Sequence, residues 1–305
     1  MTDKSALHQA LVDKLKQEGL IRTPRVEAAF RAVPRHLFLP DIPIEKVYKD
    51  DAIVTKHLNG QAVSSSSQPA IMAIMLEQLD LQVGDRVLEI GAGTGYNAAL
   101  MAHIVGETGQ VIAVDIDEDI VENARQNLAI AGFEQVEVIC DDGGFGYSNA
   151  APYDRIILTV AAWDIAPAWE EQLKSSGRIV LPLILKDKVQ LTVAFEFVDN
   201  YLVSVSKSNC GFMKLRGTFA EPEPEEKVQH NIVFRMKKLI FKVGAFLFFP
   251  FPLELQLNLY NLIKFGHSSL DNLRIRVYPQ EKNYIPTSNE LVIVKRWTRL
   301  ILDWQ

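Results

Sequence analysis

Residues Val87 to Tyr96 read Val-Leu-Glu-Ile-Gly-Ala-Gly-Thr-Gly-Tyr, and this stretch decides the fold. The apolar run before Gly91 is typical of a buried strand, and the run Asn-Ala-Ala-Leu-Met-Ala after Tyr96 is typical of a helix. The three glycines let the backbone approach a ligand closely, and the first amides of the helix stay free to donate. The stretch therefore predicts a strand, a tight turn and a helix start that form a nucleotide-type site.

The spacing of these glycines distinguishes two classes of cofactor. A dinucleotide site favours Gly-x-Gly-x-x-Gly, but position 96 is Tyr. Gly-x-Gly-x-Gly after Glu89 instead suits S-adenosylmethionine, whose amino-acid end needs close backbone approach and carries no phosphate. We expect this cofactor to bind at Glu89, Gly91, Gly93 and Gly95.

Apolar runs after the glycine motif indicate further strands. Residues 110–114 lead into Asp115, twenty residues beyond Gly95 and near the offset at which a dinucleotide fold places its ribose-binding carboxylate. Residues 136–139 lead into Cys140, Asp141, Asp142 and Gly143, which predicts Asp142 or the Gly143 amide at the adenine edge. Two more runs cover residues 155–160 and 178–185, and residues 119–131 have a helical pattern.

Strands that alternate with helices predict an α/β fold with a doubly wound parallel sheet and ligands at the carboxyl ends of its strands. This is the Rossmann-like architecture of class I S-adenosylmethionine-dependent methyltransferases, here with a C-terminal extension. The simpler alternative is that the glycines only tighten packing. Tyr96 and Met101 are interpreted as helix-face packing residues, and Cys140 as a small buried apolar residue.

Several further segments resemble the protein-L-isoaspartate O-methyltransferases. The resemblance runs from Val33 to about Cys210, and its motifs are Val33-Pro34-Arg35-His36-Leu37-Phe38, Tyr48-Lys49-Asp50, Ser67-Gln68-Pro69, the glycine motif, Asp142-Gly143 with Gly146, Ala151-Pro152-Tyr153-Asp154 and Gly177-Arg178-Ile179-Val180-Leu181-Pro182. It implies that the segment before Pro69 lines the substrate pocket and that Ser67 contacts the carboxylate to be methylated. Asp50 either orients the substrate peptide or caps a turn.

The chain departs from the family pattern in two places. The family usually has Gly-x-Gly-x-Thr-Ile-Ser before the proline, whereas residues 56–67 form a longer, polar approach in which Ser64, Ser65 and Ser66 are expected in a loop and His57 in solvent. The chain also continues about a hundred residues past the usual end. With residues 210–217, Cys-Gly-Phe-Met-Lys-Leu-Arg-Gly, it resembles a branch associated with ribosomal peptide modification, in which an ordinary aspartate can be methylated.

Composition is that of a globular enzyme. The chain has 305 residues, 48% of them hydrophobic, which is enough for one large core and a smaller second one. A net charge of −6 argues against nucleic acid as the main partner. Two cysteines without a Cys/His pair at metal spacing indicate a reducing compartment and no metal site, and the N-terminus has no apolar signal core, so we expect a cytoplasmic protein.

Composition also divides the chain into three parts. Residues 1–75 hold two helices and the substrate-pocket segment, and residues 76–210 form the cofactor domain. Residues 211–305 are an extension, most of which follows a stiff Glu/Pro linker at 221–226. In the extension, residues 273–278 and 291–294 are strand-like and expected to pair with each other or with the main sheet. The apolar stretch 239–255 is broken by Lys242, Pro250, Pro252 and Glu254, too short to span a membrane and more suited to burial on the catalytic domain than to a membrane surface.

The expected reaction needs few side-chain catalysts. A carboxylate with a pKa near ~4 is already ionised at neutral pH, so methyl transfer to it requires alignment and not a general base. The methyl ester that results can close to a succinimide. The functions left open are a carboxyl methyltransferase for isoaspartyl or aspartyl residues of a peptide or protein, a methyltransferase for RNA or a small molecule, and a non-catalytic adaptor that binds S-adenosylmethionine.

Overall fold

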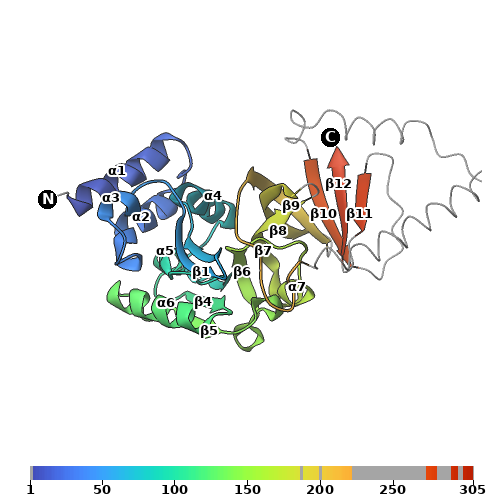
Figure 1. Ribbon diagram of the computed structural model, residues 1–305. Helices are drawn as coiled ribbons and strands as arrows, with labels where there is room; N and C mark the ends of the chain where they lie inside the picture. Colours follow the sequence, from blue (N-terminus) through green and yellow to red (C-terminus); the bar gives the residue numbers. More distant parts are fainter. Residues whose placement is uncertain are drawn as a thin grey trace, which may run out of the picture.

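The computed structural model describes residues 3–185, 188–198 and 201–221, together with the backbone of residues 273–279, 290–294 and 298–304. Figure 1 shows helices packed around a long central sheet. Strand order in this sheet is β11-β12-β10-β9-β8-β7-β6-β3-β4-β5. The described part of the chain thus has the α/β architecture that the sequence predicts.

Five strands carry the parallel part of the sheet: β3 (Arg86–Ile90), β4 (Gln110–Asp115), β5 (Glu137–Cys140), β6 (Tyr153–Leu158) and β7 (Leu173–Ile184). Within this parallel part, β3 comes first in the sequence, and β4 and β5 follow on one side of it. β6 and β7 then lie on the other side of β3. The order reverses between β3 and β6. In open α/β sheets, ligands bind at this switch point, beyond the carboxyl ends of the strands.

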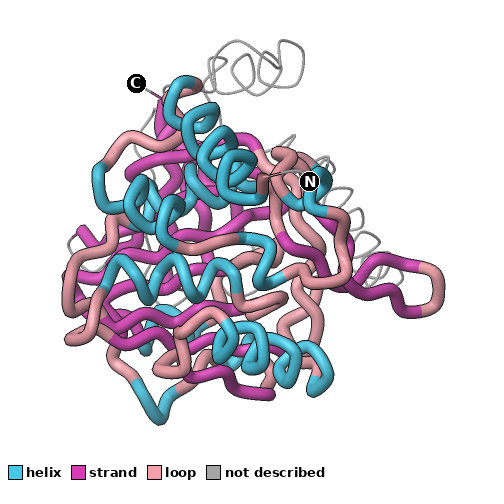
Figure 2. Tube along the Cα trace, turned by 90° about the vertical axis from the view of Figure 1, so that its left-hand side faces the viewer, coloured by secondary structure: helices cyan, strands magenta, loops and turns pink. Residues whose placement is uncertain are grey.

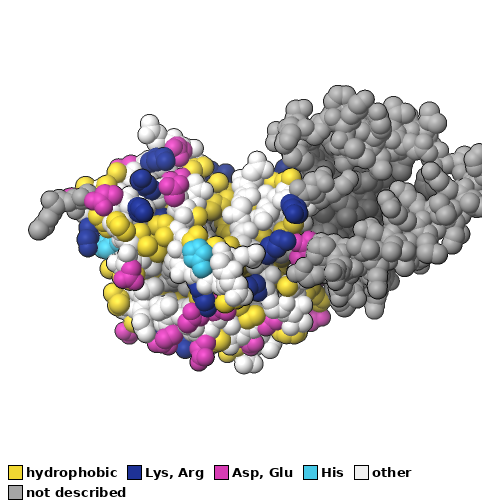
Figure 3. All heavy atoms as spheres, viewed as in Figure 1, with side chains coloured by type: hydrophobic (Ala, Val, Ile, Leu, Met, Phe, Trp, Pro, Cys, Tyr) yellow, Lys and Arg dark blue, Asp and Glu magenta, His cyan; other side chains and the backbone are white. Residues whose placement is uncertain are grey.

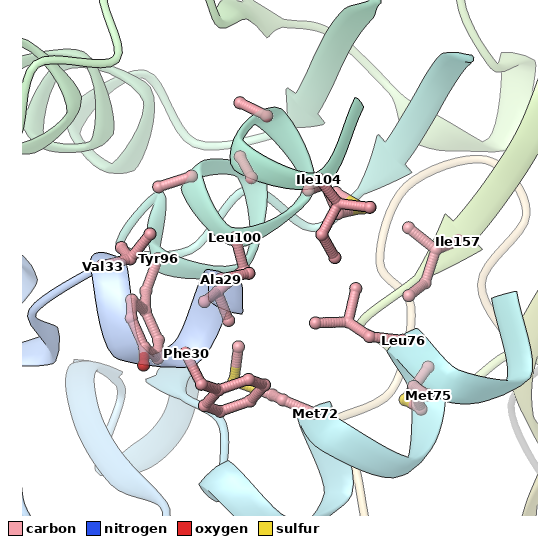
Figure 4. Close-up of a cluster of buried hydrophobic side chains, with 14 of the residues drawn as sticks. Ala29, Phe30, Val33, Met72, Met75, Leu76, Tyr96, Leu100, Ile104 and Ile157 are labelled. Atoms are coloured by element: carbon pink, nitrogen blue, oxygen red, sulfur yellow. The ribbon is translucent and has the colours of Figure 1, made fainter. Parts of the chain in front are cut away.

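Side chains alternate between two buried clusters because successive strand residues point to opposite faces of the sheet. Val87 belongs to one cluster and Leu88 to the other. The first cluster joins the sheet to helices that include α1 (Lys4–Gln17), α2 (Pro24–Ala32), α4 (Pro69–Leu79), α5 (Tyr96–Val105) and α6 (Glu118–Ile130). Figure 4 shows Phe30 and Tyr96 within it. On the opposite face, the second cluster contains Trp169 of α7 (Pro167–Gln172).

The N-terminal helices continue into a segment that corrects one expectation. After η1 (Arg35–Phe38) and α3 (Ile44–Val47), the chain forms an antiparallel hairpin of β1 (Ile53–Leu58) and β2 (Gln61–Ser66). Figure 2 shows this hairpin projecting from the body of the molecule. The serines at 64–66 therefore lie in a strand and not in a loop, with Ser64 and Ser66 buried. His57 is exposed, as expected, but belongs to β1.

Two antiparallel strands extend the parallel sheet, and the extension adds three more. β8 (Gln190–Val198) pairs with β7, and β9 (Tyr201–Asn209) pairs with β8. β10 (Leu273–Pro279) joins β9 through the pairs Arg276 with Val203 and Val277 with Leu202. β11 (Glu290–Val294) does not pair with β10, because β12 (Thr298–Trp304) lies between them. The two strand-like runs were expected to pair with each other or with the main sheet. They do not pair with each other, and β10 joins the main sheet through β9.

Two sequence expectations concern parts of the extension that lie outside the described residues. These are the Glu/Pro linker beyond Glu221 and the apolar stretch 239–255. Within the described ranges, no helix is both long and apolar enough to cross a membrane. Figure 3 shows acidic and basic side chains distributed among apolar ones on the described part of this face.

Candidate active site

A cavity of about 520 Å³ opens beyond the carboxyl ends of β3, β4 and β6. Its floor is the glycine turn after β3. One wall is the β1–β2 hairpin with the start of α4, and another is residues 210–221, which we call the strap. The residues of the strap that line the cavity are Cys210, Gly211, Phe212, Met213, Lys214, Leu215 and Arg216.

The glycine turn has the geometry that its sequence predicts. Gly91 and Gly93 line the cavity with φ angles of +100° and +53°, a region that side chains disfavour. A Cβ atom at Gly91 would lie 2.7 Å from Oγ1 of Thr159, so the position also lacks room for a side chain. Gly95 does not line the cavity in this structure. It is the N-cap of α5, with a φ of +86°.

Asp115 ends β4 and faces the cavity. Its Oδ2 accepts a hydrogen bond from the backbone N–H of Gly93 at 3.1 Å, so the carboxylate also braces the glycine turn. Burial raises the pKa of this carboxyl group, while hydrogen bonds from the N–H groups of Gly93 and Asp117 and the charge of Arg216 act in the opposite direction. A partly desolvated carboxylate at a strand end is suited to accept hydrogen bonds from hydroxyl groups of a ligand.

Glu89 lies behind the glycine turn and not on the cavity wall. Its side chain is fully buried, and its Oε1 accepts a hydrogen bond from Nδ2 of Asn97 at 2.7 Å. Oε2 of Glu89 and Oδ1 of Asn97 are buried without a hydrogen-bond partner in the described structure. Burial raises the pKa of Glu89 to about 8, so the group is largely protonated at neutral pH.

Asp142 and Gly143 follow β5 and have different surroundings. Gly143 lines the cavity. The Asp142 carboxylate instead accepts hydrogen bonds from the N–H groups of Gly144 at 2.9 Å and Thr218 at 2.6 Å. A Cβ atom at Gly217 would lie 2.6 Å from this carboxylate. Asp142 therefore anchors the strap, and Gly143 is the residue of this pair at the cavity.

Ser67 lies at the cavity wall between β2 and α4, whereas Asp50 does not line the cavity. The Asp50 carboxylate accepts hydrogen bonds from the N–H of Ala70 at 2.8 Å and from Nε2 of Gln68 at 3.2 Å. Two roles were expected for Asp50, orienting the substrate peptide or capping a turn. The structure shows the second, because Asp50 caps the first turn of α4.

The strap is fixed to the segment that follows β6. The N–H of Ala161 donates a hydrogen bond to the Met213 carbonyl of the strap at 2.7 Å. In return, the N–H of Leu215 in the strap donates to the Ala161 carbonyl at 2.8 Å. Farther along, Phe219 stacks on Trp163 at a ring distance of 5.3 Å and meets Trp169 edge-on at 5.4 Å. The strap is thus a wall of the cofactor cavity.

Asp117 connects the strap to the hairpin. Both terminal nitrogens of Arg216 donate to its carboxylate at 3.1 and 2.8 Å, and Nζ of Lys56 donates to it at 2.9 Å. Hydrogen bonds from Arg216, and then from Lys56, lower the pKa of Asp117. Sequence reasoning missed Asp117, and it gave residues 210–217 only as a resemblance and not as a cavity wall, because no local pattern indicates contacts between such distant segments. The acidic pair Asp115-x-Asp117 was the signal available.

Three other expectations have clear outcomes. Tyr96 and Met101 are buried in the first cluster, which confirms their packing role. Cys140 is exposed, so its expected burial is wrong: β5 is the edge strand and its last residue faces solvent. Arg35 was quoted only as part of a motif, yet it is fully buried beside Ser67. Within the described ranges, no group of three or more His, Cys, Asp or Glu residues could hold a metal ion.

The sheet order, the glycine turn and the carboxylate after β4 together define a class I S-adenosylmethionine-dependent methyltransferase. The sequence pattern of the family described as Protein-L-isoaspartate(D-aspartate) O-methyltransferase (PCMT) matches residues 5–218. The chain belongs to this family.

Named relatives agree with the assignment. Protein-L-isoaspartate O-methyltransferase 2 of Archaeoglobus fulgidus is 41% identical over 220 residues, which are 71% of this chain and 96% of that protein. Protein-L-isoaspartate O-methyltransferase of Thermotoga maritima is 36% identical over 245 residues, which are 80% of this chain and 71% of that protein.

Solved structures show the same fold. A protein-L-isoaspartate O-methyltransferase structure superposes with a TM-score of 0.65 at 30% identity and covers 98% of this chain and 88% of the other. The structure titled a putative protein-L-isoaspartate O-methyltransferase from Plasmodium falciparum, in complex with S-adenosyl-L-homocysteine, superposes with a TM-score of 0.60 at 20% identity. It covers 68% of this chain and 98% of the other, and at that identity it supports the fold alone.

Proposed function

We propose that the chain methylates the free carboxylate of L-isoaspartyl residues in peptides or proteins, with S-adenosylmethionine as the methyl donor. The single observation that carries this proposal is one cavity lined by both the glycine turn and Ser67. The family to which the chain belongs supplies the substrate class. The alignment with the relative from Archaeoglobus fulgidus covers 96% of that protein, which supports assigning the same substrate class to this chain.

The cofactor would occupy the part of the cavity next to the glycine turn. Gly91 and Gly93 allow close approach of the backbone, and Asp115 would accept hydrogen bonds from the ribose hydroxyls. Gly143 would face the adenine. Glu89 and Gly95 would act indirectly, by supporting the turn and the start of α5, and Asp142 by anchoring the strap.

The substrate would occupy the part of the cavity between Ser67 and the strap. When bound, S-adenosylmethionine supplies an electrophilic methyl group on a positively charged sulfur. The residues of this chain have to hold a carboxylate oxygen in line with that group and exclude water. The Ser67 hydroxyl would donate a hydrogen bond to the other carboxylate oxygen. Transfer yields a methyl ester, and attack by the next backbone nitrogen of the substrate then releases methanol and closes a succinimide.

Four finer assignments belong to this proposal: the domain boundary, the role of the extension, the alternative substrate and the compartment. The expected boundary at residue 210 moves to about residue 221, because the strap lines the cavity. The rest of the extension would then select substrates, and an aspartyl residue in ribosomal peptide maturation is the alternative substrate. The two free cysteines, Cys140 and Cys210, support activity in a reducing compartment such as the cytoplasm.

The test is methyl transfer from labelled S-adenosylmethionine to two matched peptides that differ only in an isoaspartyl or an aspartyl linkage. The proposal expects base-labile methyl ester on the isoaspartyl peptide alone. Preference for the aspartyl peptide would favour the alternative function, methylation of an ordinary aspartate in ribosomal peptide maturation. Binding of S-adenosylhomocysteine without any transfer would favour the non-catalytic adaptor.

A further inference from the structure

Arg35 is the most deeply buried charged side chain next to the substrate part of the cavity. It is fully buried, and its guanidinium donates to main-chain carbonyls of the segments before and after the hairpin. Nη1 donates to the carbonyls of Val47 at 2.8 Å and Lys49 at 3.2 Å. Nη2 donates to the carbonyls of Asp51 at 3.1 Å, Ser66 at 3.4 Å and Ser67 at 3.0 Å, and to Oγ of Ser66 at 3.4 Å.

Asp50 holds the same segment from its other side. Its carboxylate accepts from the N–H of Ala70 at 2.8 Å and from Nε2 of Gln68 at 3.2 Å, and its carbonyl accepts from the same Nε2 at 3.1 Å. Ser67 therefore lies between a residue whose carbonyl is bound by Arg35 and a residue whose side chain is bound by Asp50. The two holding side chains are themselves neighbours, because Arg35 also binds the carbonyls of Lys49 and Asp51 on either side of Asp50.

Burial of a guanidinium is costly unless its hydrogen bonds are made, and burial lowers the pKa of Arg35. A planar, rigid donor fork fixes the relative positions of several carbonyls, which the flexible point charge of a lysine does not do. Three of the six hydrogen bonds of Arg35 reach Ser66 and Ser67 at the end of β2, and the other three reach the carbonyls of Val47, Lys49 and Asp51, so the fork fixes the end of β2 against the segment before the hairpin. Nε has no hydrogen-bond partner in the described structure.

We infer that Arg35 and Asp50 are positioning residues that together orient the Ser67 main chain, so that its hydroxyl points at the carboxylate to be methylated. This inference rests on the proposed function, in which Ser67 contacts that carboxylate. Neither residue touches substrate or cofactor. Both act on the rate of transfer through Ser67.

The test compares Arg35→Lys and Asp50→Asn with wild type in the full-length chain. Methyl transfer to an isoaspartyl peptide is measured at saturating S-adenosylmethionine, and binding of S-adenosylhomocysteine is measured by calorimetry. We expect kcat to fall about 10- to 100-fold, as for a misplaced reacting group, with full binding stoichiometry and an unchanged Kd. Asp50→Asn keeps one oxygen for Ala70 and is the milder variant if Arg35→Lys does not fold.

A double-mutant cycle separates positioning from general stabilisation. If Arg35 and Asp50 act through Ser67, neither variant lowers kcat further in a Ser67→Ala background. Multiplicative losses would overturn the inference, as would equal losses of kcat and of cofactor-binding stoichiometry in the single variants.

Arg155→Lys is the matched control. Arg155 also donates to main-chain carbonyls, those of Leu79 at 2.9 Å and Asp80 at 3.2 Å, but it does not line the cavity. Its substitution should lower thermal stability and leave kcat unchanged. If Ser67→Ala alone has wild-type kcat, the inference is overturned while methyl transfer by the wild-type chain still supports the proposed function. Absence of any transfer by the wild type would overturn the proposed function itself.

Discussion

Arg216 of the strap and Asp117, the N-cap residue of α6, form a two-point ion pair beside the cavity, at 3.1 and 2.8 Å. Because Lys56 of the hairpin reaches the same carboxylate at 2.9 Å, one acidic side chain joins the two walls. The pair is partly exposed, so its strength should depend on salt.

Substitution of Asp117 should therefore loosen both walls at once. We expect Asp117→Ala to weaken S-adenosylhomocysteine binding about 5- to 50-fold, mainly through faster dissociation, which corresponds to about 1 to 2.3 kcal/mol. Stopped-flow displacement measures the dissociation rate. Asp119→Asn is the control, because Asp119 contacts Lys56 at 2.5 Å and is largely exposed. Equal dissociation rates in the two variants would show that Asp117 does not hold the walls together.

Asp115→Asn should weaken the cofactor without unfolding the chain. The amide keeps one oxygen for the N–H of Gly93 but loses the charge that strengthens hydrogen bonds to ribose hydroxyls, at a cost of about 1.5 to 3 kcal/mol. Calorimetric titration with S-adenosylhomocysteine measures the loss. Asp141→Asn, at the exposed end of the neighbouring strand, should bind as wild type does. A folded Asp115→Asn variant with unchanged affinity would remove Asp115 from the ribose role.

Glu89→Gln should change how stability depends on pH. Burial raises the pKa of Glu89 to about 8, so the folded chain keeps a proton that the unfolded chain releases above its ordinary pKa of 4.5. Wild-type stability from this group is therefore highest below pH 4.5, falls as pH rises towards 8 and then levels off. The glutamine variant lacks this loss, which for the wild type should be on the order of 4 kcal/mol between pH 4.5 and pH 8. Urea unfolding at several pH values is the measurement, and parallel curves for both proteins would contradict the raised pKa.

Truncation should separate the strap from the remainder of the extension. A chain ending at Glu221 keeps every described cavity residue and should bind S-adenosylhomocysteine, whereas a chain ending at Asn209 lacks the wall formed by the strap and should not. The comparable length of the Archaeoglobus fulgidus relative supports folding of the longer truncation. Calorimetry on both truncations decides the matter, with circular dichroism as the control for folding. Loss of binding in the longer truncation would place the rest of the extension in the cofactor site.

Local patterns in the sequence account for the strands and the cofactor turn. β3, β4 and the start of α5 follow from an apolar run, three glycines and a helical pattern, all of which are short-range signals. The hairpin was missed because its strands are polar and half-exposed, with an irregular register between Val54 and Lys56. Its serines have the composition of a loop, and only the tertiary burial of Ser64 and Ser66 makes them strand residues.

Long-range contacts account for most of the remainder. Asp142 lies at the expected strand end, but its carboxylate accepts a hydrogen bond from the N–H of Thr218, which lies 76 residues further along the chain. Asp50 similarly binds Ala70 and not the cavity. A strand-end position predicts where an acidic side chain lies. It does not predict which donor, distant in the sequence, forms a hydrogen bond with that side chain in the folded structure.

The strap has a consequence for the order in which the protein acquires its activity. Arg216 meets a carboxylate 99 residues earlier in the chain, and the glycine turn lies earlier still. A nascent chain that has emerged only through β7 contains every glycine of the turn and the full parallel sheet, but it lacks the wall that encloses the ligand. Distant contacts of this kind form late because closing long loops is entropically costly. On the ribosome, competence for the cofactor should therefore arise in a single late step, when the strap emerges and docks, and partly synthesised chains should not sequester the methyl donor.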